Sequence, residues 1–319
     1  MTAITDSSLP AAADIDLTTG ARRRRVDAAA RWFFRIGAMT TLVVTVLIIV
    51  TLVFDAWEFV SKLAADDNLG ALTDIGWFPR RGMFDISTLL VGTFIVTGIA
   101  MVVAVPLGLG SAVYLAEYAR PGVRRVVKPI IEVLAGIPSV VLGYFAIAFI
   151  NPEIVVRLFG GANKAFTLAA AGIGVGILTV PIIASVAEDA FRAVPLSLRE
   201  ASYGLGAERL QTTFRVVFPA SISGIVAALI LGISRAVGET MVVAIAAGAV
   251  GGGLFRLTPL EPGQTMTAAM AALGFGSDQV AGDDLAFQSL YFVGLLLFFM
   301  TLLLNVLSDW LVNRVREVY

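Results

Sequence analysis

The sequence predicts an all-α integral membrane protein with six transmembrane helices, and three observations support this fold class. Hydrophobic residues make up 58% of the 319 residues, and the mean hydropathy is +0.87. Soluble domains are closer to half apolar by a similar count. The apolar residues form six segments near the length that a helix needs to cross a bilayer, about 20 residues. The sequence has no cysteine and no histidine, which excludes disulfides, Cys/His metal sites and Ser-His or Cys-His catalysis.

Each apolar segment is expected to form one membrane span. The spans are 36–54, 88–115, 130–150, 166–187, 222–249 and 289–312. Pro106, Pro138 and Pro181 fall inside spans, where each is expected to bend its helix. Gly172 and Gly176 form a G-x-x-x-G pair that indicates close helix packing. Residues 1–35 are predicted to be a polar, disordered cytosolic tail, and residues 36–319 to be the transmembrane domain.

The positions of lysine and arginine orient these spans. If both termini are cytosolic, the cytosolic segments carry 16 of these residues and the external segments carry six. The positive-inside rule therefore places both termini in the cytosol. Two external segments, 55–87 and 250–288, are too long for simple turns. They are expected to hold surface helices, re-entrant segments or a contact for an external partner, and a solvated face explains them equally well.

The cytosolic segment between the fourth and fifth spans, 192–219, carries the most specific pattern, "REASYGLGAERLQTTFRVVFP". Pro195 is a favoured first residue of a helix. Gly204 and Gly206 can adopt positive φ and end that helix. A second short helix is expected to follow and to stop before Pro219. The segment is therefore predicted to be a helix-turn-helix that projects from the membrane.

This pattern resembles the EAA loop of ABC importer permeases, in which Glu-Ala-Ala is followed by a spaced Gly and an apolar-x-apolar-Pro ending. The matching residues are Glu200, Ala201, Ser202, Gly206, Val216, Phe218 and Pro219. Ser202 and Phe218 are small departures from the family pattern. The resemblance implies that the loop docks in a groove of a separate ATPase subunit. This chain has no G-x-x-x-x-G-K-[ST] motif, so ATP and Mg²⁺ are expected on that partner and no cofactor on this chain.

Three further segments resemble the phosphate-specific permeases of the Pst system, and the PstC type more than the PstA type. They are "GSAVYLAEYARPGVRRVVKPIIEVLAGIPSVVLGYF", "SRAVGETMVVAIAAG" and "MTAAMA". The resemblance implies a type I ABC importer architecture and import of inorganic phosphate across a bacterial cell membrane. It also implies three partners: a PstA-type permease, a PstB-type ATPase dimer and an external phosphate-binding protein. The net charge of −1 gives no reason to expect a nucleic-acid partner.

Two charged residues, Arg235 and Glu239, stand in the fifth apolar segment and share one helix face. A charge at a helix centre costs about 2.5–3.5 kcal/mol on the insertion scale, so such residues usually face a bundle interior or a wet cavity. Small residues lie beside them at i, i+4 spacing and permit close packing: Gly224, Ala228, Gly232 and Ala236. One interpretation is that Arg235 and Glu239 contact phosphate in transit. The other is an internal ion pair that only fixes helix packing.

Other polar residues in the apolar segments are weaker candidates. Ser139 and Thr179 could donate to phosphate near a proline, although such hydroxyls more often bond their own backbone. Glu132 lies early in the third span and is expected to have a structural or gate role together with Gly136 and Pro138.

Other functions remain open from the sequence. Within transport, the alternative is an ABC permease for another oxyanion, such as molybdate or sulfate. An ion-driven secondary transporter is a second class, and it would not need the EAA-like loop. A membrane enzyme is disfavoured because the sequence offers no histidine, no cysteine and no clear carboxylate pair at membrane depth. A scaffold or sensor protein is disfavoured as well, because the charge of Arg235 would be as costly there as on a helix that faces lipid.

The topology makes a first prediction. A reporter fused after Tyr319 should be active only if it is a cytosolic reporter, because the lysine and arginine bias places the C-terminus inside. Activity of a periplasmic reporter at the same position would contradict the orientation.

Overall fold

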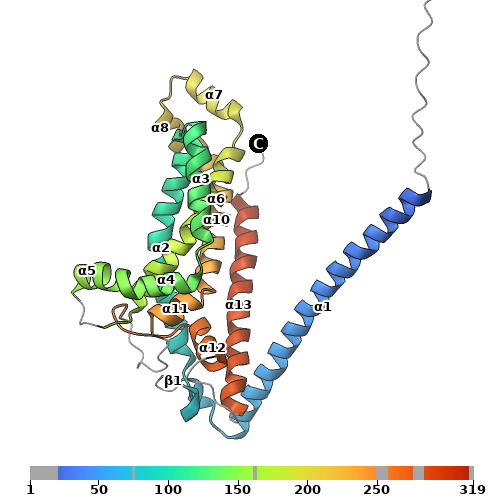
Figure 1. The fold of residues 1–319 in the computed structure, drawn as a ribbon, viewed down its shortest axis with the longest axis vertical. Coiled ribbons are helices and arrows are strands. Elements are labelled where there is room, and N and C mark those ends of the chain that lie inside the picture. Colours follow the sequence, from blue (N-terminus) through green and yellow to red (C-terminus); the bar gives the residue numbers. More distant parts are fainter. Residues whose placement is uncertain (1–20, 74–75, 161–163, 249–257, 276–283, 316–319) are drawn as a thin grey trace, which may run out of the picture. The chain divides into compact units, whose positions relative to one another are not determined.

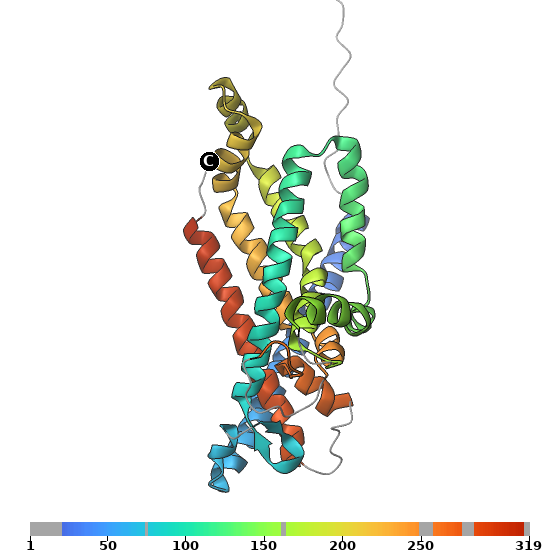
Figure 2. The ribbon, with the colours of Figure 1, turned by 90° about the vertical axis from the view of Figure 1, so that its left-hand side faces the viewer.

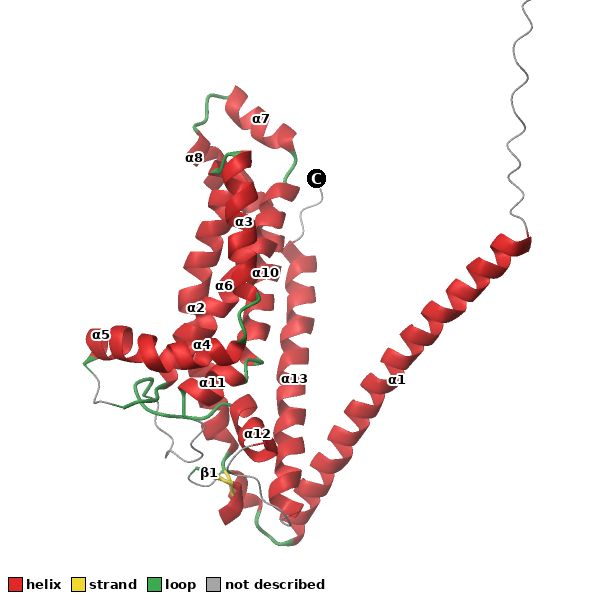
Figure 3. Ribbon diagram, in the orientation of Figure 1, coloured by secondary structure: helices red, strands yellow, loops and turns green. Residues whose placement is uncertain are grey.

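The computed structural model describes residues 21–73, 76–160, 164–248, 258–275 and 284–315. Figure 3 shows that the described chain is helical apart from connecting loops and one small strand pair. The α-helices are α1 (Ala21–Ala65), α2 (Ile86–Val113), α3 (Pro121–Ala135), α4 (Ser139–Phe145), α5 (Arg157–Phe159), α6 (Leu168–Ala193), α7 (Leu196–Gly204), α8 (Arg209–Thr212), α9 (Phe218–Ala220), α10 (Ile222–Val237), α11 (Met241–Ala246), α12 (Met266–Phe275) and α13 (Asp284–Val315). The π-helical segments are η3 (Tyr114–Tyr118), η4 (Ala146–Val156) and η5 (Thr213–Val217), and the 3-10 segments are η1 (Leu69–Leu72) and η2 (Pro79–Arg81). Strands β1 (Trp77–Phe78) and β2 (Met83–Phe84) pair antiparallel.

The chain forms two compact units, residues 1–51 and 52–319. The first unit contains most of α1, which begins at Ala21 and so includes part of the segment that the sequence assigned to a disordered tail. No glycine or proline lies between residues 21 and 36, and alanine and arginine are good helix formers, so nothing stops the helix there. Residues 1–20 of the predicted tail lie outside the described residues.

Helix α6 is the centre of the second unit and packs against both α2 and α10 (Figures 1 and 2). Small residues allow the close approach. A Cβ at Gly172 would lie 2.7 Å from a side-chain carbon of α2, and a Cβ at Gly176 would lie 2.8 Å from another. Further along α6, the glycines are on the neighbouring helices instead, and the fully buried Ile183 of α6 fills the space over Gly108 of α2 and Gly232 of α10. The packing role predicted for the glycine pair is thus confirmed.

Among the described residues, five helical stretches are long and apolar enough to cross a membrane, or six if one bent pair forms a single span. Four of the five lie in α1, α2, α6 and α13 and match predicted spans closely in place, and the remaining one is Ser139–Phe159. The bent pair includes α10, which lies in the predicted fifth span. The bent pair joins Arg209–Ala220 to α10 through a turn of 72°.

The third predicted span, 130–150, is not one helix. Helix α3 ends at Ala135, and α4 begins at Ser139 after an interruption that contains Gly136 and Pro138. Proline has no N–H for a helical hydrogen bond and disfavours helical backbone in the residue before it. In Figure 1, α3 runs alongside α6, whereas α4 and α5 run across that direction. The apolar stretch of membrane-spanning length is Ser139–Phe159.

The fifth predicted span, 222–249, is also interrupted. Helix α10 ends at Val237, and α11 begins at Met241. Gly238 and Thr240 flank Glu239 in this break, so Glu239 does not continue the helix that carries Arg235.

The second long external segment contains α12, which is buried and is not a surface helix. Met266, Ala268 and Ala269 have no exposed surface, and Met266 belongs to an apolar cluster with Phe59 of α1 and Phe84 of β2. The chain enters α12 by passing directly over α2. There, a Cβ at Gly92 would lie 2.2 Å from the backbone oxygen of Gln264.

This close approach makes a second prediction. Gly92→Ala should lower the free energy of unfolding by about 1–3 kcal/mol, because the Gln264 carbonyl must move to admit the methyl group. Gly98→Ala is the matched control, since it lies on the same helix with no atom in the way. Thermal unfolding of the purified protein in detergent measures both. Equal stability of the two variants would show that the backbone contact at Gly92 is not tight.

Candidate functional site

Arg235 and Glu239 lie together at the end of α10. Arg235 is in the last turn of the helix, where a cation is favoured by the partial negative charge of the helix end. Its Nη2 lies 3.7 Å from Oε2 of Glu239. This distance is longer than that of a strong charge-assisted hydrogen bond, about 2.7–2.9 Å. The Arg235 side chain is 50% exposed and that of Glu239 is 6% exposed, so the cation is far more accessible than the carboxylate.

Glu239 has partners other than Arg235. Its Oε1 accepts a hydrogen bond from the backbone N–H of Val242 at 3.4 Å, in the first turn of α11. Its backbone oxygen accepts a hydrogen bond from the hydroxyl of Thr267 at 2.8 Å, which joins the break to α12. The carboxylate is thus held by the fold at the start of α11. Arg235 is therefore not the sole group that satisfies Glu239.

The two predicted pathway hydroxyls lie in different environments. Thr179 has no exposed surface, and its hydroxyl donates to the backbone oxygen of Val175 at 2.8 Å, so it is not free to donate to a passing anion in this structure. Ser139 is half-buried at the start of α4. Helix α4 packs on α11 through Gly143 and Ile245, which brings the element of Ser139 next to the one that follows Glu239. Within the described residues, no hydrogen bond or ion pair joins Ser139 or Thr179 to the Arg235–Glu239 pair.

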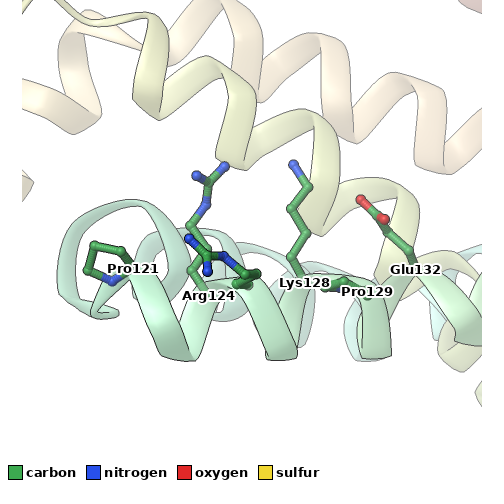
Figure 4. A pocket seen from close by; sticks show the side chains of 6 residues that line it. Pro121, Arg124, Lys128, Pro129 and Glu132 are labelled. Atoms are coloured by element: carbon green, nitrogen blue, oxygen red, sulfur yellow. The ribbon is translucent and has the colours of Figure 1, made fainter.

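A second charged group lies between α3 and α6. Glu188 of α6 has no exposed surface, and its Oε1 accepts from Nε of Arg124 at 2.5 Å while its Oε2 lies 3.1 Å from Nζ of Lys128. Lys128 also lies 3.5 Å from Asp189. Figure 4 shows Arg124, Lys128 and Glu132 pointing toward the same neighbouring helix. They line a cavity of about 430 Å³ whose walls are Pro121, Arg124, Arg125, Lys128, Pro129 and Glu132.

Sequence reasoning noticed Glu132 but missed Glu188. The i, i+4 spacing of residues 124, 128 and 132 places three charges on one face of a helix. This pattern was the signal that the face could meet a charged residue of another helix. Glu132 itself is exposed, as are Gly136 and Pro138 in the break that follows α3. The structural or gate role predicted for these three residues stays a prediction.

The EAA-like segment forms the predicted hairpin of two short helices, α7 and α8, which project beyond the ends of α2, α6 and α10 (Figure 1). We call α7, α8 and the turn between them the coupling hairpin. Gly206 in this turn has a φ of 84°, as the sequence predicted. The hydroxyls of Ser202 and Thr212 lie 2.9 Å apart and join the two helices, whereas Glu200 and Ala201 are exposed on α7.

Three local expectations for this hairpin were wrong. Gly204 is the last residue of α7 and is not among the positive-φ glycines of the described chain. Pro195 is the N-cap of α7 and not its first helical residue. The second helix does not stop before Pro219, because η5 runs directly into α9, which contains this proline. Proline is tolerated there because it stands in the first turn of α9.

The coupling hairpin exposes apolar side chains. Leu205, in the turn, is 90% exposed. The other large apolar residues exposed on and next to the hairpin are Leu196, Tyr203, Leu210 and Phe214. An apolar group of this kind on a projecting hairpin is typical of a docking surface for another protein.

The fold and the coupling hairpin define a membrane subunit of a transport system, and comparison with known proteins agrees. The family model described as "Binding-protein-dependent transport system inner membrane component" matches residues 104–317, more than half of the chain. The chain therefore belongs to this family.

Three individual relatives match the chain over most of its length. The phosphate transport system permease protein PstC 1 of Mycobacterium tuberculosis is 33% identical over 324 residues, covering 92% of this chain and 95% of that protein. The phosphate transport system permease protein PstC of Pasteurella multocida is 30% identical over 300 residues, covering 89% and 90%. The probable ABC transporter permease protein YqgH of Bacillus subtilis is 31% identical over 245 residues, covering 76% and 77%.

Solved structures share the fold. A chain of the inward-facing MetNI methionine ABC transporter matches with a TM-score of 0.53 at 22% identity, covering 76% of this chain and 97% of that chain. A chain of a bacterial ABC transporter that imports alginate matches with a TM-score of 0.57 at 14% identity, covering 92% and 100%. The predicted fold class, an all-α membrane permease of the ABC importer type, is confirmed.

The turn of the coupling hairpin makes a third prediction. Gly206→Val should uncouple ATP hydrolysis from uptake while the protein still inserts in the membrane, because a β-branched residue resists a φ of 84° and would reshape the turn. Gly204→Ala is the matched control, since that glycine has helical backbone and no neighbouring atom in the way. Uptake and ATP hydrolysis are measured in vesicles. Normal coupled uptake by the valine variant would argue against a coupling role for this turn.

Proposed function

We propose that this chain is the transmembrane permease subunit of an ATP-driven ABC importer that moves inorganic phosphate from the outside into the cytoplasm. The PstC-type relatives support this proposal because they match the chain over most of both lengths. The observation that carries it is Arg235, a half-exposed cation in an apolar helix whose neighbouring carboxylate also accepts a hydrogen bond from the backbone of α11.

The chemistry of Arg235 suits phosphate. A guanidinium stays charged when partly desolvated, and its planar fork matches two phosphate oxygens. Glu239 would accept a hydrogen bond from a P–OH group, which sulfate lacks at neutral pH. It would also offset part of the Arg235 charge and keep the site weak, as a pathway site must release its ion. Because α11 holds the Glu239 carboxylate, this acceptor would stay in place while the anion passes.

The coupling hairpin would dock on a partner that hydrolyses ATP. Its exposed Leu205 and the neighbouring apolar residues support helix-in-groove docking on a PstB-type ATPase dimer, which would hold ATP and Mg²⁺. A PstA-type permease would complete the membrane pathway, and an external phosphate-binding protein would deliver the anion. Both termini would be cytosolic in a bacterial cell membrane. In support, the C-terminal end of α13 lies at the same end of the second unit as the coupling hairpin (Figures 1 and 2).

A permease for another oxyanion is the second candidate, since a guanidinium also binds molybdate or sulfate. Uptake of labelled phosphate in the presence of each competing anion separates the two. An ion-driven secondary transporter fits less well, because the chain belongs to a family of binding-protein-dependent systems and carries the coupling hairpin.

A fourth prediction tests Arg235 directly. Arg235→Gln should lower phosphate uptake by at least about tenfold while the complex still assembles. The amide keeps hydrogen-bonding capacity but removes a charge-assisted contact worth roughly 1.5–3 kcal/mol. Arg235→Lys should be intermediate because ammonium supplies the charge without the fork. Arg157→Gln, at an exposed arginine of α5, is the control and should transport normally.

A double variant separates transport from packing. Glu239 is buried, so removing Arg235 alone leaves a buried carboxylate without its cation, whereas replacing both residues can be nearly neutral for stability. If Arg235 only balances Glu239, then Arg235→Gln with Glu239→Gln should regain both assembly and uptake. If Arg235 contacts phosphate, the double variant should assemble without uptake. Wild-type uptake by the double variant would reject Arg235 as a substrate residue.

A further inference from the structure

Both helices of the coupling hairpin contact the same short segment at the end of α2. This segment is η3, a π-helical turn of five residues that continues α2 and closes with a hydrogen bond from Ala119 to Tyr114 at 2.8 Å. Arg199 of α7 pairs with Glu117 of η3. Arg209 of α8 places its guanidinium over the ring of Tyr118, 5.2 Å from the centroid. Two independent contacts thus converge on adjacent residues, and π-helical turns occur frequently at functional sites.

The contact through Arg199 joins three elements. Its Nη2 lies 3.0 Å from Oε1 of Glu117, and the same nitrogen donates to the backbone oxygen of Phe191 at 2.7 Å. Phe191 is in the last turn of α6, where backbone oxygens lack helical partners. The Arg199 side chain is 15% exposed and that of Glu117 is 4% exposed. One guanidinium therefore connects α7 to the ends of both α2 and α6.

Burial of this ion pair is hard to explain by stability alone. A buried ion pair often contributes no more than apolar residues of similar size, because both charges lose their hydration. A packing role would be met equally well by leucine or methionine. All of α7 is described, and Ser202 is its one buried residue, bonded within the hairpin to Thr212. Leu198 of α7 packs against the apolar cluster that contains Ala112 of α2, and Arg199 adds the polar contact that joins α7 to η3.

We propose that Glu117 and Arg199 form a positioning pair that transmits displacement of the coupling hairpin to α2. Neither residue touches the transported anion. The pair fixes the orientation of α7 relative to η3, so that a movement of α7 imposed by the ATPase carries the end of α2 with it. Rigid-body motion of this kind needs a fixed connection between the driven element and the helix that moves. The inference rests on the proposed function, since it requires an ATPase that engages α7.

The decisive variant replaces both members of the pair, Glu117→Met with Arg199→Met. Methionine is similar in length and leaves no unpaired charge, so a role in folding alone should be preserved. In vesicles that contain the complete complex, we expect ATP hydrolysis to continue while the phosphate moved per ATP hydrolysed falls at least tenfold. A wild-type ratio in the assembled double variant would overturn the proposal.

A matched control and a conservative variant complete the experiment. Glu153→Met with Arg157→Met removes another ion pair, 2.8 Å long, from η4 and α5, and should keep the wild-type ratio. Arg199→Lys retains the charge without the planar fork, so its ratio should lie between those of the wild type and the double variant. If the double variant does not assemble, Arg199→Lys decides the matter, and a wild-type ratio there overturns the proposal. Failure of both variants to assemble would assign the pair to assembly and also reject transmission.

The wild-type complex tests the underlying function separately. If it moves no phosphate with ATP, the proposed function fails, whatever the variants do. If it transports phosphate and the Glu117–Arg199 variants couple normally, the function stands and only the positioning pair is rejected.

Discussion

The close contact of α6 with α2 and α10 is the constraint on which the rest of the second unit depends. In a membrane, helices gain little from burying apolar surface against one another, because lipid is equally apolar. Their association needs close van der Waals contact, and here glycine provides it. Gly172 and Gly176 of α6 admit α2, while Ile183 fills the space over Gly108 and Gly232. This three-helix core fixes the position in space of the C-terminal end of α10, and therefore the position of Arg235.

Interruptions in two apolar segments place polar residues at helix ends. The break after α10 contains Glu239, whose carboxylate accepts from the start of α11. The break before α4 exposes Gly136 and Pro138 and precedes Ser139. Since α4 packs on α11, the two interruptions belong to neighbouring elements. A break leaves backbone groups unpaired, and membrane proteins tolerate such breaks where protein or a cavity satisfies them.

The ends of α2 and α6 show a different chemistry from the core. Two nearly or fully buried carboxylates, Glu117 and Glu188, each pair with cations from another element. Glu188 holds α3, an amphipathic helix with no buried residue of its own, and Glu117 holds α7. Charge therefore helps to attach the peripheral helices, whereas glycine and branched apolar side chains assemble the central ones. Such attachments specify position more than they add stability.

The sequence by itself determined the fold class, the approximate place of five spans and the coupling hairpin. Long apolar runs can only be satisfied as helices in a bilayer, and a glycine pair or a spaced motif acts through local chemistry that a sequence displays directly. It also singled out Arg235 and Glu239, because a charge in an apolar run is conspicuous. It did not show that Glu239 stands in a break or that α12 is buried.

Tertiary structure alone decided which charges meet. Arg124 and Glu188 are 64 positions apart, and Glu117 and Arg199 are also far apart in the chain, so no periodicity links them. Their pairing follows from the packing of α6 on α2, which brings the ends of both helices together and places α3 and α7 beside them. Hydropathy is a property of each residue and its neighbours in sequence, whereas an ion pair between helices is a property of how those helices pack.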